Sequence, residues 1–353
     1  MRVKRIFVQQ VKQKKFMRTL LDSIAAFIMA VITLLLSSGD AKACASCGCT
    51  LSSDWENLQF SYTPGLKLDL RYDYLNQDQL RSGTKTIAPD VASQIVNNGN
   101  PQEVEKYTRN RYYTLGIDYS TSHDWGLNVQ VPYIDRKHST LGTASDGFTP
   151  GPGGGQFDSH TSGLGDIKVI GRYQGFTQQC KFGVLYGIKL ATGSYTETGT
   201  STDPTAPGPV PIDRGLQPGS GTTDAIVGAY YSDGLNQNWD YFTQVMFQRA
   251  LNSSNDYKPG DGLNLNVGLR YVGITGFAPV LQLNYRHVRH DEGANADQIS
   301  TGGTLIYLSP GITASVSRQV SVYGFYQLPV YQDVNGVQLA PRYTASVGVR
   351  YSF

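Results

Sequence analysis

The last stretch of the chain, Tyr343-Thr-Ala-Ser-Val-Gly-Val-Arg-Tyr-Ser-Phe353, decides the fold. Apolar or aromatic side chains occupy every second position, and the positions between them hold threonine, serine, glycine and arginine. Strict alternation of this kind predicts a β-strand with one apolar face and one polar face. Because the polar face carries an arginine, we expect it to meet water while the other face meets an apolar environment.

The same alternation recurs along the chain, most clearly at 66–74 and 263–271. It predicts twelve strands, at 58–75, 109–120, 125–136, 164–176, 181–192, 222–233, 237–250, 262–273, 277–289, 302–317, 319–329 and 342–353. We therefore expect an all-β fold, a transmembrane antiparallel up-and-down barrel over residues 58–353. A soluble all-β protein with an aromatic core is the alternative, but such a protein would not need charged residues on the polar face of its strands, which would point to the interior.

The expected connections alternate between long and short. Long ones fall at 76–108, 137–163, 193–221, 251–261, 290–301 and 330–341, and short ones at 121–124, 177–180, 234–236, 274–276 and near 318. Barrels of this class have long extracellular loops and short periplasmic turns, so an even strand number places both termini in the periplasm. Segments 147–155 and 199–221 are rich in Gly, Pro, Thr and Ser, and we expect such loops to gate the outer mouth.

The N-terminus has the pattern of a cleaved signal peptide, residues 1–43. A basic region up to Arg18 precedes an apolar run at 24–36, and Ala41-Lys42-Ala43 follows as a small-x-small cleavage site. The run is shorter than the ~20 residues that a membrane-spanning helix needs. Either Met1 or Met17 fits as the start, since 17–43 alone form a compact signal peptide.

Composition agrees with an exported barrel in the bacterial outer membrane. Charged residues make up only 16% of the chain, whereas Gly (39) and Tyr (23) are abundant. The net charge of +2 gives no reason to expect a nucleic-acid partner. Aromatic residues near strand ends are expected to form interfacial girdles in the lipid bilayer: Tyr112, Tyr113, Trp125, Tyr133, Tyr230, Tyr231, Trp239 and Tyr241. The terminal Phe353 is typical of strands that the outer-membrane assembly machinery recognises.

Charged residues on the polar faces are the candidate lumen and transport residues. They are Lys67, Asp69, Arg71, Asp73, Asp118, Lys168, Arg172, Lys189, Arg270, Arg286 and Arg350. Charges on the lipid face would cost ~2–4 kcal/mol each at the midplane, so these side chains are expected to point inward. Two interpretations stay open, a polar conduit whose charge tunes selectivity and an ion-pair lattice that fills a narrow lumen.

Four cysteines suggest chemistry at the periplasmic side. Cys44, Cys47 and Cys49 open the mature chain in an expected periplasmic segment, 44–57, and Cys180 starts a later strand. Disulfides, a soft-metal site and lipidation of Cys44 are three interpretations that all stay open. Haem attachment is excluded because Gly48, not histidine, follows Cys47. No other cofactor is expected.

Several segments carry a family resemblance. Ser162-Gly-Leu-Gly-Asp-Ile167, Gly221-Thr-Thr-Asp-Ala225, Leu308-Ser-Pro-Gly311 and Gln327-Leu-Pro-Val-Tyr331 together resemble the outer-membrane barrel family linked to the meta-cleavage pathway of phenol degradation. The resemblance covers most of the mature chain and implies passage of small, aromatic or apolar compounds. The cysteine-rich start is not a general feature of that family.

The sequence thus predicts a barrel that passively conducts small solutes across the outer membrane. A non-conducting scaffold that docks periplasmic metal-handling or electron-transfer partners through Cys44–Cys49 is the first alternative. An outer-membrane enzyme is the second, but neither a Gly-x-Ser-x-Gly motif nor a phosphate-binding glycine loop is present. We therefore expect no catalytic residues.

Overall fold

We describe the fold from a computed structural model of residues 64–97, 100–101, 104–141, 156–201 and 208–353. The expected signal peptide (1–43) and cysteine segment (44–57) lie outside these residues, as do Cys44, Cys47 and Cys49. Across the described part of the chain, no helix has both the length and the apolar character needed to cross a membrane. Strands make up most of the regular structure there.

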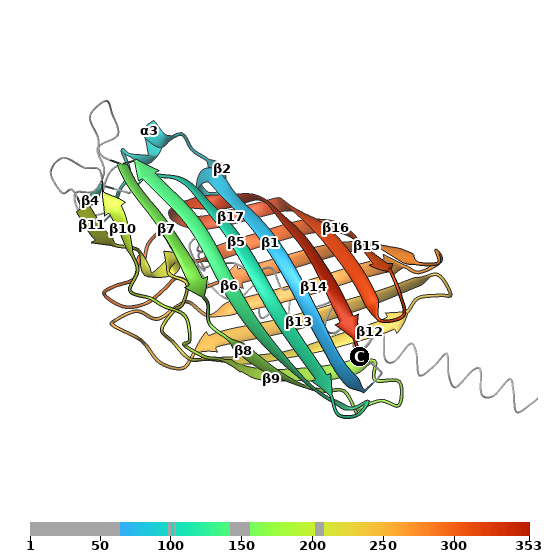
Figure 1. The fold of residues 1–353 in the computed structure, drawn as a ribbon. Helices are drawn as coiled ribbons and strands as arrows, with labels where there is room; N and C mark the ends of the chain where they lie inside the picture. Colours follow the sequence, from blue (N-terminus) through green and yellow to red (C-terminus); the bar gives the residue numbers. More distant parts are fainter. Residues whose placement is uncertain (1–63, 98–99, 102–103, 142–155, 202–207) are drawn as a thin grey trace, which may run out of the picture. The chain divides into compact units, whose positions relative to one another are not determined.

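Eleven strands of the described chain form one closed antiparallel ring (Figure 1). They are β1 (Gly65–Gly83), β5 (Val104–Ser120), β6 (Trp125–Leu141), β8 (Lys168–Tyr173), β9 (Phe182–Lys189), β12 (Asp224–Gly234), β13 (Trp239–Ala250), β14 (Gly262–Tyr271), β15 (Phe277–Val288), β16 (Gly303–Ser315) and β17 (Val320–Ser352). Neighbours in this order are hydrogen-bonded, and the ring closes because β17 pairs with β1. The alternating segments therefore form a closed barrel, as the sequence predicts.

Shorter elements extend the barrel at one end, which we call the loop end. β7 (Gln156–Leu164) continues along the edge of β6 beyond β8, and β10 (Thr198–Ser201) and β11 (Gly208–Pro211) add to β7. The others are β2 (Lys85–Thr86), α3 (Pro89–Ala92), β3 (Val96–Asn97), β4 (Asn100–Pro101) and the 3-10 turn η1 (Arg214–Leu216). The opposite edge, the terminal end, holds Gly65, Ser352 and the short connections 121–124, 174–181, 235–238, 272–276 and 316–319.

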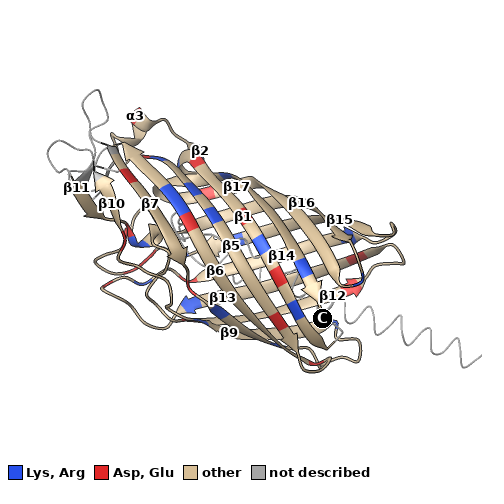
Figure 2. Ribbon diagram, in the orientation of Figure 1, with Lys and Arg blue, Asp and Glu red and all other residues tan. Residues whose placement is uncertain are grey.

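Burial alternates along the strands and separates an inner face from an outer one. On β1, Leu70 is 61% exposed, whereas Asp69 and Arg71 on either side of it are 5% exposed. Figure 2 shows charged positions along β1, β5 and β6 with uncharged positions between them. Large apolar side chains such as Leu115 and Leu127 stay exposed on the outer face. A continuous apolar exterior is unfavourable in water and matches the hydrocarbon layer of a membrane.

Aromatic residues mark one border of the apolar band. The rings of Tyr72, Tyr113 and Tyr133 follow one another across β1, β5 and β6, with centroids 5.1 and 6.5 Å apart. One outward position further towards the loop end, Arg111 forms an ion pair with Asp135 at 3.2 Å. Outward charges need water, so the apolar band ends between these two levels.

Two of the expected girdle residues have a different place. Tyr112 and Tyr230 are only 2% and 6% exposed and point into the barrel. Tyr112 packs with Leu75 and Ile134, and Tyr230 packs in a second apolar cluster that contains Ile226. The expectation was wrong for them because each has the inward parity of its strand, which an aromatic residue can occupy when apolar neighbours share the interior.

Three expected loops contain strand. β1 and β5 extend into 76–108, β6 and β7 into 137–163, and β10 and β11 lie within 193–221. Beyond Arg111 and Asp135 these strands rise out of the apolar band, with polar outer faces. Leu80 of β1, Val104 of β5 and Leu339 of β17 pack there in a small buried core. This core lets the sheet continue in water where the membrane pattern stops.

The expected loop 330–341 is also strand, and β17 covers both of the last two expected strands. Its first part, up to Val334, is antiparallel to β16, and the part from Val334 onward is antiparallel to β1. Gly336 lies between them with φ +46, in the left-handed region that glycine adopts most easily. Gln332 Nε2 donates to the Pro341 carbonyl (2.7 Å), and this hydrogen bond links the two parts of β17.

Candidate functional site

Ion pairs line the inner wall near the terminal end. Arg71 binds Asp73 at 2.7 Å, Arg350 binds Asp69 at 3.3 Å across the β1–β17 seam, and Arg172 lies 3.5 Å from Asp118. Tyr323 also donates its hydroxyl to Asp69 (2.9 Å). These charges are buried and paired, as low-dielectric surroundings require. This part of the inner wall therefore fits the ion-pair lattice.

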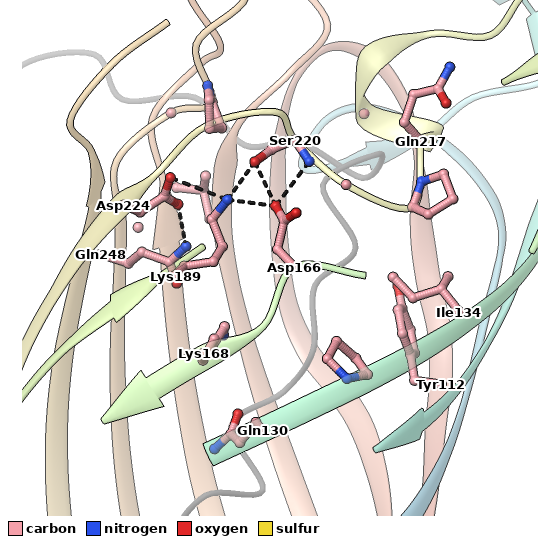
Figure 3. A pocket seen from close by; sticks show the side chains of 18 of the residues that line it. Tyr112, Gln130, Ile134, Asp166, Lys168, Lys189, Gln217, Ser220, Asp224 and Gln248 are labelled. Atoms are coloured by element: carbon pink, nitrogen blue, oxygen red, sulfur yellow. Dashed lines mark hydrogen bonds and ion pairs between the residues drawn. The ribbon is translucent and has the colours of Figure 1, made fainter. Parts of the chain in front are cut away.

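Lys189, at the end of β9, is the centre of a second cluster (Figure 3). Its Nζ lies 2.7 Å from Asp166 and 3.3 Å from Asp224, and it donates to the Thr222 carbonyl at 2.9 Å and to the Ser220 hydroxyl. Asp166 in turn accepts the Ser220 backbone N–H at 3.0 Å. The cluster ties the β7–β8 junction to the segment that leads into β12.

Amide side chains form a network on the wall of β13–β16, beside Arg286 and the Arg270–Asp240 pair. A chain of hydrogen bonds runs from the Ser309 hydroxyl to Asn284 (2.6 Å), from Asn284 to Asn266 (2.7 Å) and from Asn266 to Gln244 (3.3 Å). Gln282 joins this chain by accepting from Asn284 (3.1 Å). These amides bond to one another without net charge, although Gln282 Nε2 is buried without an acceptor among the described atoms, so this wall has a lower charge density than the opposite one.

Residues 212–221, in the long connection between β9 and β12, fold inward against the wall, and we call them the inward segment. Arg136, which is 3% exposed on β6, donates to the carbonyls of Gly215 (3.0 Å) and Gln217 (3.3 Å). From the same turn, Arg214 stacks over the rings of Tyr195 and Tyr257 at 4.5 and 4.8 Å. The segment therefore contacts the β6 wall and the β13–β14 connection on which Tyr257 lies, and it narrows the loop end.

A cavity of about 220 Å³ lies inside the barrel beside this segment. Charged groups from the wall and the segment line it together with apolar side chains, among them Ile134 (Figure 3), Met246 and Val288. Lining residues come from β1, β5, β6, β8, β9 and β12–β15. The cavity is therefore part of the barrel interior and is the candidate functional site.

The candidate residues from the sequence fall into two groups. Arg71, Lys168, Lys189 and Arg286 line the cavity. Lys67, Asp69, Asp73, Asp118, Arg172, Arg270 and Arg350 lie on inner faces but outside its lining. Of these, Arg270 binds Asp240 at 2.6 Å near the terminal end.

Sequence reasoning missed four charged residues of the lining, Arg136, Asp166, Arg214 and Asp224. Asp166 and Asp224 stand in the Gly-Leu-Gly-Asp and Gly-Thr-Thr-Asp segments, whose pattern indicates only the start of a strand. Arg136 is the last residue of an expected strand. Arg214 falls in an expected loop, and no local pattern shows that such a loop turns inward.

Cys180 lies in a turn at the terminal end, between β8 and β9. It is 7% exposed, has φ 49 and forms no disulfide with another described residue. Its Sγ lies 3.7 Å from the His123 carbonyl, and burial raises the pKa of the thiol, which lowers its reactivity. Within the described ranges no three His, Cys, Asp or Glu side chains form a metal-binding group.

Comparison with solved structures places the fold among outer-membrane barrels. An outer membrane channel from Pseudomonas putida F1 has a TM-score of 0.58 at 13% identity, over 90% of this chain and 99% of that one. A monoaromatic hydrocarbon channel, CymD, has a TM-score of 0.46 at 11% identity, over 82% and 89% of the two chains. The P. putida toluene transporter TodX has a TM-score of 0.45 at 10% identity, over 83% of this chain and 91% of that one.

Sequence comparison gives no further assignment. No family model matches the chain, and no curated protein matches it. The closed ring, its apolar outer band and the shared fold with an outer membrane channel place the protein in the bacterial outer membrane.

Proposed function

We propose that this protein is a channel of a Gram-negative outer membrane through which small solutes pass passively. The cavity inside a closed barrel carries this proposal. The lining combines polar groups that fix orientation with apolar surface that accepts a carbon skeleton, which is the usual composition of a small-molecule site. The channel has no catalytic residues in this proposal.

The strand count and the orientation belong to the same proposal. In a ring whose neighbours are all antiparallel, the number of strand passes must be even, so we count β17 as two passes that reverse near Gly336. This gives twelve. Both barrel termini then lie at the edge with short turns, which we place in the periplasm, and the loop end faces outward. After cleavage of 1–43, the segment 44–57 would lie at that periplasmic mouth.

Small aromatic or apolar compounds are the proposed solutes. The volume of the cavity supports this size class, since a cavity of about 150 Å³ already holds benzene. The family resemblance of the Gly-Leu-Gly-Asp and Gln-Leu-Pro-Val-Tyr segments adds a link to phenol degradation.

Insertion in the membrane would follow recognition of the Phe353 strand by the assembly machinery.

Single-channel recording in planar lipid bilayers tests the proposal. The mature chain, folded in detergent and shown to be heat-modifiable on gels, should give discrete current steps of low conductance because the inward segment narrows the barrel. Uptake of benzyl alcohol by proteoliposomes should exceed uptake by empty liposomes. A correctly folded barrel that conducts no ions and speeds no uptake would exclude a channel.

A sealed scaffold barrel is the second candidate, and the paired charges Arg71–Asp73, Asp69–Arg350 and Asp118–Arg172 favour it. Such a barrel would act through its periplasmic mouth, where Cys44, Cys47 and Cys49 could bind a soft metal or a protein partner. Thiol titration with metal analysis tests whether these cysteines are free to bind a metal or a partner. Two stable disulfides without bound metal would leave no soft-metal site for such a partner to use.

A further inference from the structure

We infer that the cavity binds small organic anions and that single-ring carboxylates are the class that fits it best. This inference deepens the proposed function and rests on it for passage through the barrel, whereas binding can be measured independently. It comes from two features of the lining, an excess of positive charge and an apolar surface of limited extent.

Among the residues that the structure describes, basic side chains outnumber acidic ones around the cavity. The bases are Arg71, Arg136, Lys168, Lys189, Arg214 and Arg286, and the acids are Asp166 and Asp224. Asp73 binds Arg71 from just outside the lining, and counting it still leaves three more positive than negative charges. A low-dielectric wall strengthens this field, so a negative solute is favoured over a neutral or positive one.

The acids near the cavity are already engaged. Asp166 and Asp224 both lie against the single ammonium of Lys189, and Asp224 also accepts from Gln248 at 2.6 Å. Nearer the terminal end, Asp69 and Asp118 are paired with Arg350 and Arg172. Two carboxylates against one ammonium leave one negative charge at this cluster, which offsets only part of the positive charge of the inward segment, β6, β8 and β15.

Arg136 and Arg214 supply that charge. Neither forms an ion pair with any residue that the structure describes. Arg136 is held by neutral oxygens, the two carbonyls of the inward segment, Asn110 Oδ1 (2.5 Å) and the Tyr112 hydroxyl (3.3 Å). Arg214 donates Nη2 to the Ser220 carbonyl (2.8 Å), and its Nε is buried without a hydrogen-bond acceptor among the described atoms. A carboxylate would complement both guanidinium groups.

The apolar lining limits the rest of the solute. Tyr112, Ile134 and Met246 face the cavity from three strands, and prolines 132, 218 and 259 add rigid apolar surface. A volume of about 220 Å³ exceeds that of a cavity that holds benzene, ~150 Å³, by enough for one carboxyl group. Aromatic faces and edges next to guanidinium groups suit a planar ring that carries a negative charge.

The experiment compares three single-ring probes of similar size and different charge: benzoate, benzyl alcohol and benzylammonium. Calorimetry on the detergent-folded full barrel measures binding, and proteoliposome flux measures passage. We expect benzoate to bind at least about tenfold more tightly than benzyl alcohol, the effect of one charge-assisted hydrogen bond. Benzylammonium should bind more weakly than either.

Variants then test whether the preference for benzoate depends on the arginines of the cavity lining. Arg214→Gln should lower benzoate affinity about tenfold and leave benzyl alcohol affinity unchanged, while Arg214→Lys should keep part of the preference. Arg289→Gln is the matched control, because this arginine lies outside the lining with 61% of its side chain exposed. It should leave all three affinities unchanged.

The outcomes separate this inference from the proposed function. Equal affinity for benzoate and benzyl alcohol, or the same loss in Arg289→Gln as in Arg214→Gln, would overturn the anion site and leave a channel for neutral solutes standing. Selective benzoate binding without flux or current would support the anion site and overturn the channel. Selective binding together with benzoate flux would support both.

Discussion

At the scale of single residues, a buried carboxyl group beyond the apolar band, that of Glu105, has an unusual pKa. Glu105, at the start of β5, accepts the Leu339 backbone N–H at 2.9 Å, and its other oxygen lies 4.0 Å from His138 Nδ1. Burial raises the pKa of Glu105 to about 7, and the Leu339 hydrogen bond opposes this only in part. The same environment lowers the pKa of His138 to about 3, so its imidazole stays neutral.

Glu105 should therefore make stability fall as pH rises. Below about pH 4.5 both folded and unfolded chains hold the proton, but between 4.5 and about 7 only the folded chain keeps it. His138 has the opposite effect up to about pH 6.5, because only the unfolded chain protonates it there. We therefore expect the Glu105 contribution to the free energy of unfolding in urea, read as the difference between the parent protein and Glu105→Gln, to drop by about 1 to 3 kcal/mol between about pH 5 and about pH 8. Glu105→Gln should flatten this slope, whereas Glu292→Gln, an exposed partner of Lys258, should not.

A steric contact on the inner wall gives a second prediction at this scale. The ring of Tyr323 on β17 lies over Gly348, so a methyl group at 348 would overlap it. Gly348→Ala should push the ring away from Asp69 and destabilise the barrel by about 1 to 3 kcal/mol, as overpacking does. Gly163→Ala is the control, since a methyl group there would meet no described atom within 4 Å. Equal urea midpoints for both variants would contradict this account.

At the scale of strands and loops, the inward segment forms a constriction that β6 holds through Arg136, in addition to contacts with β7, β9 and the start of its own connection. The two charged hydrogen bonds from Arg136 to the Gly215 and Gln217 carbonyls are worth about 1.5 to 3 kcal/mol each. In Arg136→Gln we expect the displaced segment to be populated about tenfold more often, with larger and longer current steps. Lys137→Gln, which changes the exposed neighbour, should behave like the parent protein.

If Arg136→Gln left both the current steps and the hydrogen exchange of residues 212–221 unchanged, the segment would not be held from β6. Hydrogen exchange serves as the second readout because it follows the segment even in a barrel that does not conduct. A protein that no longer folds would be recognised on gels before either measurement.

The elements also show what sequence alone can predict. The strands of the membrane band follow from a period of two, which is a local property, and so does the inward parity of residues such as Asp69 and Arg270. The inward segment depends on contacts such as Arg136 to Gln217, which are 81 residues apart, and no local pattern encodes them. β7 and β10 were missed because their Gly-, Ser- and Thr-rich sequences resemble loops, although the partner strand completes their hydrogen bonds.

At the scale of the whole barrel, charge is distributed unevenly. The β1, β5, β6 and β8 side is rich in arginines, lysines and aspartates, whereas an amide network dominates the β13–β16 side beside Arg286 and the Arg270–Asp240 pair. A solute in the interior thus meets fixed charge on one side and adaptable donors and acceptors on the other. This asymmetry would orient a charged group towards β6 and the rest of the molecule towards the amide-rich wall.

Closure between the first and last strands is the feature on which this interior depends, and it can be tested directly. Asp73 and Ser346 are register partners whose side chains meet inside the barrel, with Ser346 Oγ 2.5 Å from Asp73 Oδ1. In a chain without its native cysteines, Asp73→Cys with Ser346→Cys should form a disulfide on oxidation. The denatured chain should then migrate faster, because residues 273 positions apart are joined. Asp73→Cys with Val347→Cys should not crosslink, since neighbouring positions of a strand face opposite sides. Equal crosslinking of the two pairs would mean that the β1–β17 register, and the closed interior built on it, is wrong.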